Sequence, residues 1–122
     1  MPKKTTDTVL ALLRAVKRIL RTKKRWTKEA MARDKNGTLR LPSSACATQF
    51  CVSGALARAA TLAKASEAEE NHAARALACT TDYDLKEHTH TYHIVVYNDT
   101  RERTHKQILA WIDRAIASWK KS

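Results

Sequence analysis

Turn-forming residues are scarce in this chain, and this scarcity restricts the folds that it can adopt. Only two glycines and two prolines occur in 122 residues. An all-β sandwich or barrel needs many tight turns, so that class is excluded. Alanine and leucine are the most abundant apolar residues, and both favour helices. We therefore predict a mainly α (α+β) fold that forms a single domain over residues 1–122, with residues 1–5 and 121–122 flexible.

Four segments carry the signals of helices. Residues 6–23 place apolar side chains at helical spacing on one side and Arg and Lys on the opposite side. Residues 44–64 are apolar almost all round, which is typical of a helix in the middle of a bundle. Two capping boxes predict the starts of helices over residues 67–79 and 105–120. The sequence thus predicts about four helices around the apolar one.

Two other segments favour β-structure. Asn36 and Gly37 form a turn signal within residues 26–41, because glycine accepts a positive φ at little cost. This predicts a small β-hairpin. Residues 90–97 are β-branched and aromatic, which favours a third short strand. A short buried helix is the alternative for this segment, and we expect Asn98 and Asp99 to form the turn that follows it.

The sequence also bears on the compartment. No run of about 18 apolar residues is present, so we expect no membrane span. The basic start of the chain is not followed by an apolar run of the signal-peptide kind. Three cysteines form an odd set without a close pairing motif, which favours a reducing compartment over a disulfide framework. We therefore predict a cytoplasmic protein.

Positive charge is concentrated in the first third of the chain. The net charge is +11, and residues 1–42 hold 13 Lys and Arg against three acids. A localised basic surface suggests a polyanionic partner, with nucleic acid first. The alternative is a solvated helix face whose cations stabilise the helix C-terminus. The predicted polyanion-binding residues are Arg14, Lys17, Arg18, Arg21, Lys23, Lys24, Arg25, Lys28, Arg33 and Lys35.

Two further groups of residues carry weaker signals of chemistry. His88, His90 and His93 are candidates for a metal site, but they lack a spaced zinc motif, so a surface histidine cluster is the favoured interpretation. Cys51 lies within the apolar segment, where a thiol is more often a packing group than a nucleophile. In the same segment, we expect Gly54 to permit a close backbone approach. We predict no catalytic residue and no cofactor.

Three segments occur together in a fixed order. They are Trp26 with residues 32–37 (Ala-Arg-Asp-Lys-Asn-Gly), residues 51–59 (Cys-Val-Ser-Gly-Ala-Leu-Ala-Arg-Ala), and residues 97–99 (Tyr-Asn-Asp) with Arg103 and Thr104. Together they resemble a family of small uncharacterised proteins found in bacterial and phage genomes, which usually has tryptophan at position 97. The resemblance implies a bacterial or phage-infected cell as the setting, and no established activity.

These observations lead to one preferred function and two alternatives. We expect a small intracellular accessory protein that binds nucleic acid or a nucleoprotein complex, mainly by phosphate contacts from its basic N-terminal third. The first alternative is a protein-interaction module or inhibitor, for example phage-encoded, that docks on an acidic protein surface. An uncharacterised enzyme is the third and least favoured interpretation, because the sequence contains neither a phosphate-binding loop nor a catalytic motif.

Overall fold

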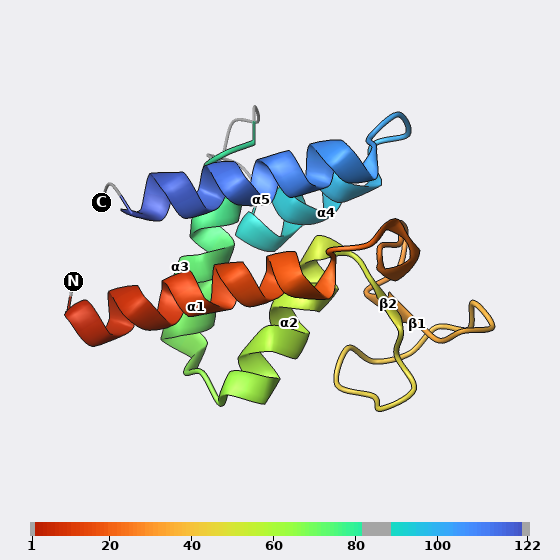
Figure 1. The fold of residues 1–122 in the computed structure, drawn as a ribbon, viewed down its shortest axis with the longest axis horizontal. Helices are drawn as coiled ribbons and strands as arrows, with labels where there is room; N and C mark the ends of the chain where they lie inside the picture. The colour runs from red at the N-terminus through yellow and green to blue at the C-terminus, as the bar shows by residue number, and fades with distance from the viewer. Residues whose placement is uncertain (1, 82–88, 121–122) are drawn as a thin grey trace.

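The computed structural model describes residues 2–81 and 89–120, and helices account for most of them (Figure 1). This confirms the prediction of a mainly α fold with a small β element. The elements within these residues are α1 (Lys3–Ile19), the 3-10 turn η1 (Lys23–Arg25), β1 (Ala32–Arg33), β2 (Gln49–Phe50), α2 (Val52–Ala63), α3 (Glu67–Ala78), α4 (His90–Asp99) and α5 (His105–Lys120).

Helix α1 packs on three other helices. In Figure 1 it lies between α5 and α2, runs antiparallel to α5, and is crossed by α3. Its apolar side is fully buried at Val9, Leu12, Leu13 and Val16, as the spacing predicts. The exposed side holds the Arg and Lys residues. One helix therefore supplies both a large part of the core and part of the basic surface.

The bounds of α1 differ from the predicted 6–23 at both ends. The helix begins at Lys3, directly after Pro2, whose φ of −59° suits a helix start. Residues 3–5, which we expected to be flexible, thus lie in its first turn. The helix ends at Ile19 because Leu20 turns into the core, where its carbonyl oxygen lies 2.6 Å from His105 Nε2.

The turn at Asn36 and Gly37 is confirmed. Gly37 has a φ of +81°, and its N–H donates to the Asp34 carbonyl at 3.0 Å. The main partner of β1, however, is not the segment that follows this turn directly. Strand β1 pairs antiparallel with β2, with Ala32 opposite Phe50. The small sheet therefore uses residues that the apolar pattern assigned to the second helix.

Helix α2 accordingly begins at Val52 and not at residue 44. Cys51 is extended and caps the helix, because its Sγ accepts the Gly54 N–H at 3.2 Å. Arg58 holds the segment before β2 in a loop. Its guanidinium donates hydrogen bonds to the carbonyl oxygens of Pro42 and Ser44 in that segment, at 2.9 and 2.7 Å. The helix packs on α1, α3 and α4, yet Leu62 near its end is 70% exposed. The prediction that α2 is enclosed on all sides holds only for its first two turns.

Residues 90–97 form helix α4, so the favoured prediction of a strand was wrong. Thr89 caps the helix by accepting the Tyr92 N–H at 3.2 Å. Within α4, His93, Ile94, Tyr97 and Asn98 are buried, and this spacing suits one side of a helix that packs on α2 and α3. Tertiary packing thus overrides the β propensity of these residues. Asn98 and Asp99 end this helix rather than forming a separate turn.

Helices α3 and α5 form as the capping boxes predict. Ser66 and Glu69 exchange hydrogen bonds at the start of α3. In α5, Trp111 is fully buried, donates from Nε1 to the Leu77 carbonyl at 2.9 Å and lies 4.4 Å from the Tyr97 ring. Trp111 therefore joins α5 to α3 and α4, which places the centre of the core where these helices meet.

Gly54 provides a test of the packing between α2 and the segment before β1, which contains Met31. A Cβ at this position would overlap the Met31 carbonyl oxygen, which accepts the Cys51 N–H at 3.2 Å. Helix propensity alone would make Gly54→Ala stabilising by about 1 kcal/mol. We expect the overlap to dominate and the free energy of unfolding in urea to fall by about 1–3 kcal/mol. Ser53→Ala, one position earlier, is the control and should change it by less than about 0.5 kcal/mol.

Candidate functional site

The side chain of Asn98 lies where the three motif segments meet. It is completely buried. Its Oδ1 accepts from Trp26 Nε1 at 2.9 Å and from the Val52 N–H at 3.0 Å, and its Nδ2 donates to the Thr27 carbonyl at 3.1 Å and to Asp99 Oδ1 at 2.9 Å. One amide therefore joins the loop after η1, the first turn of α2 and the last turn of α4.

Further polar contacts surround this amide. Asp99 Oδ1 also accepts the N–H of Glu29, a residue held at a φ of +63°. Lys28 Nζ donates to the carbonyls of Thr100 and Arg101 at 2.7 and 3.0 Å. These hydrogen bonds join residues more than 65 positions apart in the chain. We therefore assign the motif residues of this junction a structural role.

Arg33 and Asp34 serve the turn that contains Gly37. Arg33 donates to the Gly37 carbonyl at 3.0 Å and to Thr27 Oγ1 at 3.2 Å. Burial alone would raise the pKa of Asp34, but hydrogen bonds from Arg40 and from the N–H groups of Thr38 and Asn36 outweigh it and hold that pKa below its usual value. Asp34 is thus an ionised side chain that fixes the turn.

Cys51 lines a shallow hollow of about 320 Å³ together with Met31, Val95, Asp99 and two neighbours of Met31. Its thiol donates to the Met31 thioether sulfur at 3.9 Å. Burial raises the pKa of this thiol, and the Asp99 carboxylate adds to the rise, although the Gly54 N–H opposes it. A raised pKa keeps sulfur in the unreactive thiol form. These contacts fit the interpretation of Cys51 as a packing and capping residue.

The histidine candidates do not assemble into a metal centre within the residues that the structure describes. His90 begins α4, and His93 is buried one turn later. His88 lies outside the described residues. Among the side chains of residues 2–81 and 89–120, no three His, Cys, Asp or Glu come close enough together to hold a metal ion.

Four of the predicted polyanion-binding residues line one hollow. Arg14, Lys17, Arg18 and Arg21 surround a space of about 280 Å³, with Leu109 of α5 as its apolar wall. Lys17 forms an ion pair with Asp113 of α5 at 2.7 Å, and both side chains are about half exposed. We call the side chains of Arg14, Lys17, Arg18 and Arg21 the cationic face.

The structure places the other six basic candidates in three settings. Lys23, Lys24 and Arg25 are exposed in η1, shortly after the cationic face. Lys28 and Arg33 are engaged in the internal hydrogen bonds described above, and Lys35 lies exposed in the Gly37 turn. Internal hydrogen bonds thus occupy two of the ten predicted residues.

Sequence reasoning missed two features of this region. Leu109 and Asp113 of α5 border the cationic face, although α5 is remote from it in sequence. Leu62 was predicted to be part of the core but is exposed beside α1. The polar neighbours Thr61 and Lys64 are the local signal in the sequence that the end of α2 is exposed.

The fold and this surface define a small, mainly helical protein with a buried polar junction and an exposed cationic face. A model of a family described as "Family of unknown function (DUF6197)" matches residues 4–118. The chain therefore belongs to this family. Neither a curated protein nor a solved structure matches it. None of the helices in the described part of the chain has the length and hydrophobicity needed to cross a bilayer.

The polar junction can be tested by removing the Asn98 amide. Asn98→Ala leaves the Trp26 indole N–H, the Val52 N–H and the Thr27 carbonyl without their partner. Each unpaired buried group costs about 1–3 kcal/mol, so we expect the free energy of unfolding to fall by about 3 kcal/mol or more. Asn71→Ala, at an exposed position of α3, should change it by less than about 0.5 kcal/mol. Equal effects of the two substitutions would contradict the role of Asn98.

Thiol labelling tests the assignment of Cys51. Cys46 and Cys79 are exposed, whereas Cys51 is buried with a raised pKa. We expect mass spectrometry after brief treatment with iodoacetamide at neutral pH to show modification of Cys46 and Cys79 well before Cys51. In denaturant, Cys51 should be modified as fast as Cys46 and Cys79. Rapid native labelling of Cys51 would instead identify it as a reactive thiol.

Proposed function

We propose that this protein binds nucleic acid through the cationic face, mainly by contacts with phosphates. The observation that carries the proposal is the gathering of four cations around one hollow. The side chains of Arg14, Arg18 and Arg21 make no hydrogen bond or ion pair with any residue that the structure describes. They are therefore available to an external anion.

The spacing of these cations suits a phosphate chain. At about 1.5 Å per residue, α1 advances by about 6 Å from Arg14 to Arg18, and Arg21 follows just beyond the end of the helix. One strand of a duplex places a phosphate about every 3.4 Å along its axis, so about two phosphates lie within the distance from Arg14 to Arg18. Each neutralised phosphate releases a condensed counterion, which favours binding at low salt. The exposed cations of η1 extend the same basic region.

The same geometry argues for little sequence preference. The opposite side of α1 is buried in the core, so only one side of the helix can face a nucleic acid. The indole N–H of Trp26 is engaged by Asn98, and Trp111 is fully buried. Phosphate contacts position a protein without reading bases. Three free cysteines fit the expected reducing, intracellular setting, in a bacterial or phage-infected cell.

Charge neutralisation tests this proposal. We expect the quadruple variant Arg14→Gln, Lys17→Gln, Arg18→Gln and Arg21→Gln to bind a fluorescein-labelled DNA duplex and a single-stranded RNA more weakly in anisotropy titrations. The slope of log K against log salt should fall by about one unit for each lost phosphate contact. The control variant removes equal charge at exposed sites away from this face, through Lys64→Gln, Arg75→Gln, Arg101→Gln and Lys120→Gln.

A second variant should act in the opposite direction. Asp113→Asn frees Lys17 from its ion pair and removes an acid from the border of the cationic face. We expect tighter binding to both probes, with a small change in stability because exposed pairs contribute at most about 1 kcal/mol. Equal losses in the two quadruple variants would show that net charge alone attracts the probes. Unchanged affinity in the first quadruple variant would refute the proposal outright.

A further inference from the structure

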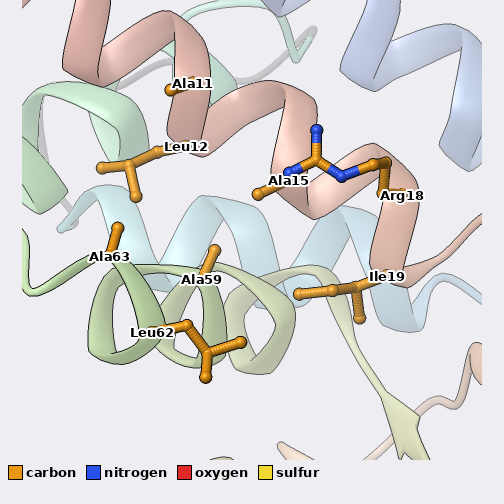
Figure 2. Close-up of a pocket in the computed structure, with 8 residues that line it drawn as sticks. All are labelled: Ala11, Leu12, Ala15, Arg18, Ile19, Ala59, Leu62 and Ala63. Atoms are coloured by element: carbon orange, nitrogen blue, oxygen red, sulfur yellow. The ribbon is translucent and has the colours of Figure 1, made fainter.

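An apolar groove lies on the other side of α1, between α1 and α2. It has a volume of about 380 Å³, and Figure 2 shows Ala59 and Ala63 pointing from α2 toward α1, with Arg18 extended along the α1 rim. Its lining consists of Ala11, Leu12, Ala15, Ile19, Ala59, Leu62 and Ala63, with Arg18 at the edge. Every lining residue other than Arg18 is therefore apolar.

The groove is accessible because its walls carry small side chains. Ala11 and Ala63 are exposed, Ala15 and Ile19 are half-buried, and Leu62 is 70% exposed at the outer edge. Small residues on two adjacent helices leave space between them for the side chains of a third element. Leu62 belongs to a regular helix, so its exposure is not a consequence of loop structure.

The charges around this groove limit what can occupy it. Residues 8–19 and 52–64, which form its two walls, contain no acid, and the charged residue that lines the groove is Arg18. A second copy of the chain, with a net charge of +11, would be repelled. A phosphate chain would match the charge but would leave the apolar lining without a partner. The fitting occupant is therefore apolar at its centre and acidic at its edges.

We propose that the groove between α1 and α2 binds an acidic amphipathic helix of a partner protein. Such a helix presents apolar side chains at positions i, i+3 or i+4, and i+7, which is how helices dock into apolar grooves. Its acidic flank would face Arg18. This surface goes beyond the proposed nucleic-acid binding, because apart from Arg18 it shares no residue with the cationic face.

Peptide selection provides the test. The probe is a displayed library of 16-residue helical peptides with randomised anchor and flank positions, selected on the intact protein. We expect the enriched peptides to combine Leu, Met or Phe anchors at helical spacing with Glu or Asp on the flank. Enrichment of acidic peptides without anchors, or of no peptides at all, would overturn the proposal.

Matched variants then assign the binding site. Leu62→Gln should weaken an enriched peptide about tenfold or more, whereas Leu41→Gln, which alters an equally exposed leucine of a loop, should leave binding unchanged. Ala11→Gln, which narrows the groove from the α1 side, should also weaken binding, and Ala68→Gln on α3 should not. Circular dichroism verifies that each variant is folded. Equal binding by the Leu62 and Leu41 variants would overturn the proposal.

Two further measurements separate this proposal from the proposed function. The triple variant Arg14→Gln, Lys17→Gln and Arg21→Gln should lose affinity for the labelled duplex but keep affinity for the peptide. Leu62→Gln should keep affinity for the labelled duplex but lose affinity for the peptide. Loss of duplex binding in Leu62→Gln would assign the groove to the nucleic-acid surface and overturn the peptide proposal, whatever the result for the cationic face.

Discussion

The buried amide of Asn98 is the interaction on which the arrangement of this protein depends. Its four hydrogen bonds are made in a region closed to water, where an unpaired donor or acceptor is costly. Because the amide binds the Val52 N–H and the Thr27 carbonyl, it fixes where α2 begins and where the loop after η1 runs. Helix α2, which packs on α1, is thereby held at its first turn by the last turn of α4.

Local signals were sufficient for some elements and insufficient for others. The starts of α3 and α5 follow from capping boxes, whose hydrogen bonds are made within one turn and are therefore visible in sequence. Residues 90–97 and 44–51 were misassigned because distant contacts decide their structure. The N–H of Cys51 donates to the Met31 carbonyl, twenty positions earlier, and this contact has no counterpart in the local pattern.

The same distinction explains the outcome for the candidate site. Clustered Lys and Arg predicted a basic surface, but composition does not show which cations are already engaged. Lys28 is bound by carbonyls of residues 100 and 101, so only the folded chain reveals that it is occupied. Conversely, Leu62 continues an apolar pattern and was expected in the core. It is exposed because α2 extends beyond the helices that cover its first turns.

Arg18 stands at the boundary between the two surfaces that we propose. It lines the hollow of the cationic face and the edge of the groove, on either side of the same helix. A phosphate and a carboxylate cannot both take full advantage of one guanidinium, so each ligand would reduce the affinity for the other. By linkage this coupling is equal in both directions. The placement of one arginine on α1 would thereby make the two binding events antagonistic without a change in the fold.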